Sequence, residues 1–193
     1  MTAQISDTFV YLKCRFSLAG INGSSLFHPE QIGLEVEPIS TACWRGFKST
    51  YTIADERLYL SRLRVGLSES DRSLADRGEG LVCFGKKLQR TGQDGYGFSD
   101  FLHPVDFTGG LLLASNFIKE MYVHMGFHPA YKYREVHELI FDSGTLLSAV
   151  DRSEQMREFR EMLSGEPLSP TNPLDGRAIQ AWVERAFSLD YKL

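Results

Sequence analysis

Three short segments decide the fold: Asp55-Glu-Arg-Leu-Tyr-Leu-Ser61, Thr108-Gly-Gly-Leu-Leu-Leu-Ala114 and Asp142-Ser-Gly-Thr-Leu-Leu-Ser148. Each follows an apolar or aromatic residue and begins with residues that favour tight turns, because they tolerate positive φ or bond their own backbone. The apolar run behind each turn is typical of a returning strand. The sequence therefore predicts three β-hairpins.

The segments around these hairpins extend the prediction to the whole chain. Residues 8–18 alternate in their second half and predict one half-buried strand, with one face formed by Leu12, Cys14, Phe16 and Leu18. After residue 150 the apolar period changes from two to about 3.6, which predicts a helix ending near Gly165 and a second one containing Trp182. We expect a single α+β domain, mainly β: an antiparallel, hairpin-built β-sandwich or partly open barrel over residues 1–150. Two C-terminal helices over residues 151–193 pack on it.

Composition narrows the class of partner. The 193 residues are 42% hydrophobic and 24% charged, which is enough for a sizeable core. The net charge of -4 and the lack of a basic stripe argue against nucleic acid as a partner. No stretch approaches the roughly 18 apolar residues of a membrane span, so we expect no membrane partner and a cytoplasmic location. Cys14, Cys43 and Cys83 form no Cys-x-x-Cys pair and are expected to be reduced.

A histidine-rich stretch from Tyr122 to His137 is the strongest candidate for chemistry. It holds three of the five histidines, and neighbouring imidazoles can bind a divalent metal. On a strand, His137 shares a face with Glu135 and Tyr133. One interpretation is a small metal-dependent hydrolase in which a metal is held by His124, His128 and His137, with Glu135 as base or fourth ligand. The other is that these are ordinary surface or hydrogen-bonded histidines.

Trp44 and Arg45 form a second candidate. An arginine beside a tryptophan can stack on a planar ligand or clamp a carboxylate with two hydrogen bonds. The alternative is a packed tryptophan and an arginine paired with an acidic neighbour such as Glu37 or Asp55.

Standard catalytic motifs are absent from the sequence. No Gly-x-Ser-x-Gly elbow occurs, and the glycines from Gly92 to Gly97 lack the Lys-Ser/Thr of a phosphate-binding loop. We therefore assign no catalytic residue, expect no cofactor, and leave open whether the protein is an enzyme. The prediction is a soluble cytoplasmic binding protein for an unknown small molecule or protein, and a homo-oligomer is compatible with it. Its ligand-binding residues would be Trp44, Arg45, Tyr122, His124 and His128.

Three segments resemble a set of conserved bacterial proteins of unassigned function. They are Thr41-Ala-Cys-Trp-Arg-Gly-Phe47, the run from Tyr51 to Leu60, and Tyr122-Val-His-Met-Gly-Phe127. The resemblance covers about half of the chain and brings no catalytic residues with it. Immunity or effector-associated roles are common among small acidic proteins of this kind, which is an association and not a mechanism.

Overall fold

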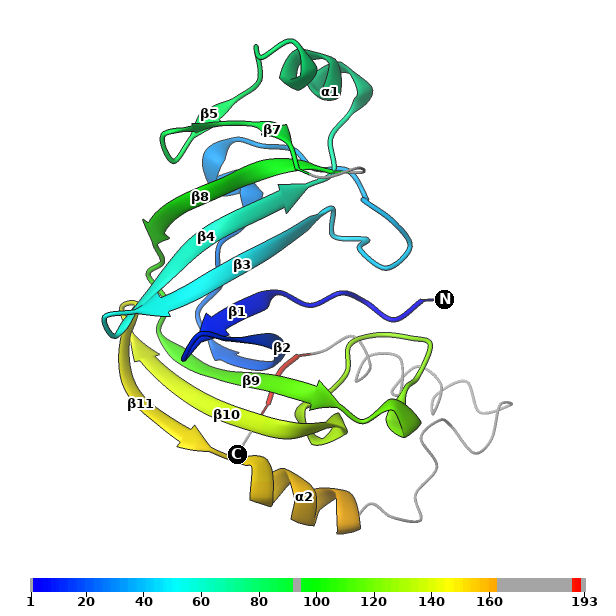
Figure 1. Ribbon diagram of the computed structural model, residues 1–193, viewed down its shortest axis with the longest axis vertical. Helices are drawn as coiled ribbons and strands as arrows, with labels where there is room; N and C mark the ends of the chain where they lie inside the picture. The colour runs from blue at the N-terminus through cyan, green and yellow to red at the C-terminus, as the bar shows by residue number, and fades with distance from the viewer. Residues whose placement is uncertain (1, 92–94, 163–188, 192–193) are drawn as a thin grey trace.

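Seven strands close into a β-barrel in the computed structural model, which describes residues 2–91, 95–162 and 189–191 (Figure 1). Their order round the barrel is β11 (Thr145–Asp151), β10 (Tyr133–Asp142), β9 (Gly109–Phe117), β2 (Cys14–Gly23), β1 (Thr8–Tyr11), β3 (Phe47–Ala54) and β4 (Arg57–Val65). One residue pair, Thr145 with Arg57, joins β11 to β4. Beyond β4, the sheet continues into β8 (Tyr96–Pro104) and β7 (Gln89–Arg90). The predicted class is confirmed, with a barrel as its architecture.

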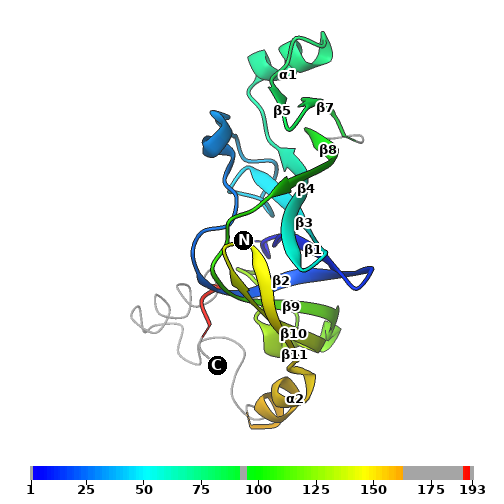
Figure 2. The ribbon, with the colours of Figure 1, turned by 90° about the vertical axis from the view of Figure 1, so that its left-hand side faces the viewer.

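Short elements fill the connections between these strands. They are the helix α1 (Glu69–Asp76), the two-stranded ribbon of β5 (Val82–Cys83) and β6 (Lys86–Lys87), and the 3-10 turns η1 (Pro29–Ile32), η2 (Lys119–Met121) and η3 (Ala130–Lys132). The first predicted C-terminal helix is present as α2 (Ser153–Met162), and the second lies outside the described residues. α1 and α2 lie at opposite ends of the long axis (Figures 1 and 2).

Two of the three predicted hairpins are present. Asp55 and Glu56 turn between β3 and β4 with φ of 48° and 57°, and Ser143 and Gly144 turn between β10 and β11 with φ of 48° and 75°. Positive φ at both central residues matches the right-handed twist of the flanking strands. The sequence rule therefore works where Asp, Ser or Gly occupies the turn.

The third hairpin prediction is wrong, because β9 pairs with β2 and β10 and not with β8. Gly109 begins β9 with a φ of 141°, and a Cβ there would lie 2.0 Å from the carbonyl oxygen of Asn22. The glycine that suggested a turn instead lets two strands approach closely.

Residues 8–18 form a hairpin and not the single strand that the alternation predicted. Leu12 and Lys13 occupy the turn with φ of 50° and 65°, and Leu12 is 71% exposed. Phe9 and Phe16 then face each other across the hairpin and are both buried. Because neither Leu12 nor Lys13 is a usual turn former, the turn between β1 and β2 could not be predicted from residue type. The long connection from 24 to 46 then brings the chain back so that β3 pairs with β1 in parallel.

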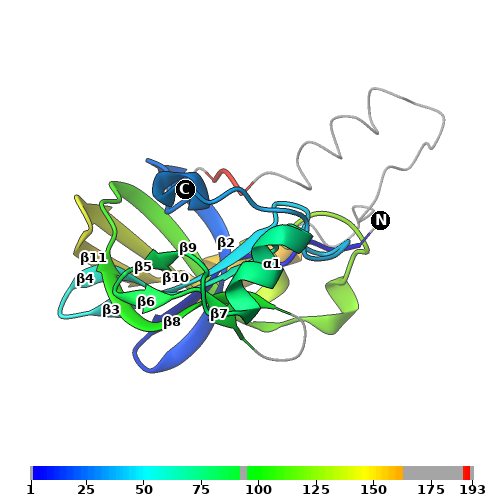
Figure 3. The same cartoon turned by 90° about the horizontal axis from the view of Figure 1, so that it is seen from above.

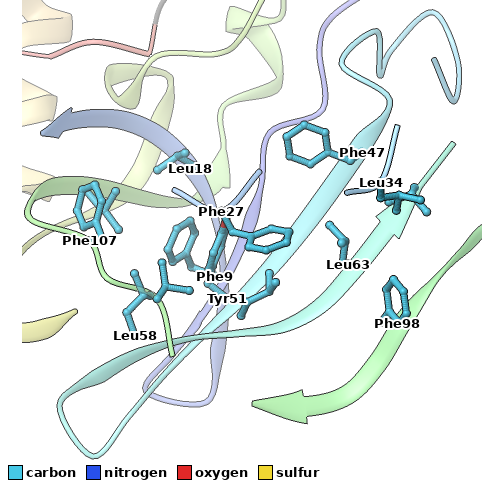
Figure 4. Packing of buried hydrophobic residues seen from close by; sticks show 14 of the residues in the cluster. Phe9, Leu18, Phe27, Leu34, Phe47, Tyr51, Leu58, Leu63, Phe98 and Phe107 are labelled. Carbon is cyan, nitrogen blue, oxygen red and sulfur yellow. The ribbon is translucent and has the colours of Figure 1, made fainter. Parts of the chain in front are cut away.

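Aromatic and leucine side chains fill the barrel (Figure 4). Phe9 stacks on Tyr51 with ring centroids 4.8 Å apart, and both are fully buried. A smaller apolar cluster lies on the outer side of β2, β9 and β10, beneath α2 and η3; its members are Ala19, Leu112, Ala114, Ala130, Tyr133, Val136 and Met156. The barrel is thus packed inside and covered on one side.

The described C-terminal residues lie against the same side as that smaller cluster. Ile21 donates its backbone N–H to the carbonyl oxygen of Leu189, and the Tyr191 hydroxyl donates to Glu138 Oε1 at 3.2 Å. A Cβ on Gly110 would lie 2.1 Å from the Tyr191 hydroxyl oxygen. Gly110 therefore makes room for the Tyr191 ring.

Candidate functional site

Arg45, one of the predicted ligand-binding residues, is partly buried and is bound by the buried carboxylate of Asp7. Its two terminal nitrogens contact the two carboxylate oxygens of Asp7 at 3.0 and 2.5 Å, and Asp7 is only 4% exposed. The carboxylate also accepts the backbone N–H of Ser49 at 2.7 Å, and the guanidinium lies 4.6 Å from the Phe47 ring centroid. Burial by itself would lower the pKa of Arg45, but the attraction of Asp7 raises it overall.

The carboxylate clamp predicted for Arg45 is therefore present, but its target belongs to the same chain. The acidic partners suggested by the sequence, Glu37 and Asp55, are wrong, since Asp7 takes that place. Trp44 is not packed in the core either: it is 65% exposed. Of this pair, Trp44 is the residue that a partner can reach.

Tyr122, His124 and His128, three of the predicted ligand-binding residues, lie together. The Tyr122 ring is 4.8 Å from that of His124 and 5.2 Å from that of His128, and Phe117 lies 4.6 Å from His128. Both ring nitrogens of His128 are buried and have no hydrogen-bond partner among the described residues. Burial, with a smaller contribution from Lys132, lowers the pKa of His128 to about 4. This histidine is a neutral, packed ring at pH 7.

The two sets of predicted residues meet at the N-terminal segment. Gln4 donates its backbone N–H to the carbonyl oxygen of Gly126, in the loop that holds Tyr122 and His128. The side-chain oxygen Oε1 of Gln4 accepts a hydrogen bond from the backbone N–H of Trp44 at 3.3 Å. Gln4 thus links the two loops at one end of the barrel, and each loop presents one exposed aromatic side chain, Trp44 or Tyr122.

A histidine-held metal has no geometric support in the parts of the chain that the structure describes. These contain no group of three or more His, Cys, Asp or Glu side chains able to hold an ion. His137 does share a face with Glu135, with 3.2 Å between Nε2 and Oε1, as predicted. Tyr133 does not join them, because it packs in the smaller apolar cluster. Hydrogen bonds from Ser115 and then His137 lower the pKa of Glu135.

A hollow of about 530 Å³ on the outer face of the barrel was not predicted from the sequence. We call it the groove; it is lined by Val10, Arg15, Thr50, Ser61, Arg62, Asp100, Phe101 and Leu102. Its floor is β3 and β4, which lie between β1 and β8 (Figure 1). The hairpin of β1 and β2, which carries Arg15, projects beyond the neighbouring strands (Figures 2 and 3). The groove therefore lies between that hairpin and β8.

Two exposed cations that face the groove have no acidic partner among the described residues. Neither Arg15 nor Arg62 forms a side-chain hydrogen bond or ion pair with the residues described here. Asp100, which has a φ of 59°, is the acid that lines the groove, and it accepts the hydroxyl of Ser99 at 2.8 Å. The β4–β8 ladder shifts register between Leu60 and Arg62, and such irregularities re-aim side chains.

A second hollow, of about 250 Å³, lies further along the same strands. It is lined by Ile5, Ile39, Ser40, Cys43, Lys48 and Arg64. Cys43 immediately precedes Trp44 and Arg45, so this hollow adjoins the predicted site. Burial raises the pKa of the Cys43 thiol, which keeps it protonated and unreactive at pH 7.

The sequence contained one signal for these basic residues. Arg62 and Arg64 flank the fully buried Leu63, which is the pattern of a strand with one apolar and one basic face. That alternation was compatible with a strand or a bend, and Arg15 and Lys48 are too distant in sequence to be added to it.

Comparison with known proteins supplies no relative: no family model, no curated protein and no solved structure matches this chain. The resemblance to conserved bacterial proteins thus stays a prediction. Within the described residues, no helix combines the length and the apolarity needed to cross a membrane.

Proposed function

We propose that the protein is a cytoplasmic binding protein that captures an anionic ligand in the groove. The observation that carries the proposal is the pair of arginines, Arg15 and Arg62, that face one hollow without an acidic partner among the described residues. Guanidinium groups suit carboxylates and phosphates, because their planar array of donors matches two oxygens at once.

The rest of the groove suits a small molecule or part of a larger one. Its volume lies within the roughly 300–1,000 Å³ typical of ligand sites. Thr50 adds a hydroxyl group, while Val10, Phe101 and Leu102 supply apolar contacts. The Ser61 hydroxyl already donates to the carbonyl oxygen of Thr50. The three cysteines are unpaired, which supports a reducing compartment.

Titration with two small anions tests this proposal. Citrate represents carboxylates and pyrophosphate represents phosphates, and amide chemical shifts report binding at constant ionic strength. We expect one of them to shift Thr50, Ser61 and Arg62. Arg62→Gln and Arg15→Gln should each weaken that binding about tenfold, the value of one charge-assisted hydrogen bond.

Arg57→Gln is the matched control, because Arg57 is exposed on the same strand but does not line the groove. It should change the affinity less than about twofold. The proposal is overturned if neither anion binds, or if Arg15→Gln and Arg62→Gln weaken binding no more than Arg57→Gln does.

A further inference from the structure

The groove and the second hollow are two parts of one basic face. Thr50 pairs with Arg62 across β3 and β4, and Lys48 pairs with Arg64 in the same ladder. The first pair contributes to the groove and the second to the smaller hollow. Because a strand rises about 3.4 Å per residue, the two hollows are centred on rows about 7 Å apart.

Lys48 places a partly buried cation in the second hollow, and its ammonium group forms no hydrogen bond or ion pair with the described residues. It lies directly opposite Arg64, and like charges facing each other across a ladder are unfavourable. Burial is the main cause that lowers the pKa of Lys48. The Asp7 carboxylate and, more weakly, Cys43 act to raise it, whereas the cations of Arg45 and Arg64 act to lower it. Asp7, however, is already bound by Arg45 and by the Ser49 N–H. An anion entering this hollow would stabilise the charged form of Lys48, which burial disfavours.

We infer that the two hollows together bind an extended acidic segment of a partner polypeptide. In an extended chain, every second side chain points the same way, at a spacing of about 6.8 Å. Carboxylates at alternate positions would therefore meet Arg62 in the groove and Lys48 in the second hollow. Apolar side chains of the segment would find Ile5 and Ile39 beside Lys48. This inference rests on the proposed function and names the class of ligand.

A single-stranded nucleic acid fits this face less well. Such ligands bind through bases stacked on exposed aromatic rings, in addition to charge. The one aromatic residue lining either hollow, among those described, is Phe101, and its ring is already stacked on Phe84 at 4.5 Å. The face offers cations, hydroxyls and aliphatic groups, which suit a peptide.

Fluorescence anisotropy with three labelled probes tests the inference. The first is a peptide of ten residues in which Glu and Ser alternate. The second is a control peptide of the same composition, Glu-Glu-Ser-Ser-Glu-Glu-Ser-Ser-Glu-Ser, in which no two Glu residues lie two positions apart. The third is a thymidine oligonucleotide of about the same length. The alternating peptide should bind best. Lys48→Gln should weaken its binding about fivefold or more, whereas Arg57→Gln should change it less than about twofold.

Binding of the small anions distinguishes the peptide inference from the proposed function of the groove. Lys48→Gln should leave binding of citrate or pyrophosphate in the groove within about twofold of the unmodified protein. The peptide inference is overturned if Lys48→Gln leaves peptide affinity unchanged, if the control peptide binds as tightly as the alternating one, or if the oligonucleotide binds more tightly than either peptide. Any of these results, together with Arg62-dependent binding of a small anion, leaves the proposed function standing. Circular dichroism spectra of the variants show whether each is folded.

Discussion

Removing the charge of Asp7 should destabilise the protein strongly, and the structure sets the size of the effect. In Asp7→Asn, the Arg45 guanidinium keeps its charge but loses the anion that offsets its burial. Breaking a buried ion pair from one side costs about 3–5 kcal/mol. The Arg45 side chain is 30% exposed, so water compensates in part and we expect about 3 kcal/mol.

Urea unfolding followed by circular dichroism measures this loss of free energy, and thermal unfolding measures the matching change in Tm. For a chain of this length each kcal/mol corresponds to about 2–4 °C, so Tm should fall by about 6–12 °C. Glu79→Gln is the control, since Glu79 pairs with Arg77 at 3.3 Å on the surface, and it should change stability by less than about 0.5 kcal/mol. A second variant, Asp7→Asn with Arg45→Met, should recover part of the loss.

The reasoning would be refuted if Asp7→Asn cost less than about 1 kcal/mol, or if the double variant were less stable by the full sum of the single losses. Either result would mean that Arg45 does not depend on Asp7, and that its guanidinium is available to a ligand as the sequence first suggested. The same cycle therefore decides whether Arg45 is a structural or a binding residue.

Three further outcomes follow from local geometry. The pKa of His128 is about 6.5 in the unfolded state and about 4 in the folded state, so the unfolded state binds the proton more tightly. The free energy of unfolding should therefore be highest above about pH 6.5 and fall by up to about 3 kcal/mol towards pH 4. His128→Gln should flatten this part of a stability–pH profile. Gly110→Ala should lower Tm because the added Cβ displaces Tyr191, and Tyr191→Ala should lower Tm too. The double variant should be no less stable than Tyr191→Ala alone. A further loss of stability in the double variant would mean that the Gly110 methyl group clashes with another residue. Replacing Leu12 by Asn and Lys13 by Gly should stabilise the turn by about 1–2 kcal/mol in thermal unfolding, because both positions have positive φ.

The turns show how far local sequence specifies this fold. Asp55 and Gly144 mark real hairpins because their own chemistry favours positive φ. Leu12 has no such preference, and the turn there forms because burying Phe9 against Phe16 outweighs its strain. Gly109 is the converse, since its conformation serves a contact with β2 that is distant in sequence. Short-range signals thus succeed where a turn is decided locally and fail where a long-range contact decides it.

The candidate site shows the same division. The proximity of Tyr122, His124 and His128 follows from their short separation in the sequence. The partner of Arg45 was not, since Asp7 lies 38 positions away and reaches it only through the parallel pairing of β1 with β3. The sequence offered a carboxylate as one of several possible partners of Arg45, and the topology determined that this carboxylate is Asp7.

Net charge is a poor guide to partners when the fold sorts charge by face. The chain carries a net charge of -4, yet Arg15, Lys48, Arg62 and Arg64 line hollows in which Asp100 is the acid described. At physiological salt a charge acts over about 8 Å, so an approaching anion responds to this face and not to acidic residues elsewhere. The acidic remainder of the surface then has its own effect, since it repels anions that approach anywhere else. If the proposed anionic ligand binds in the groove, its affinity should therefore fall as salt is added.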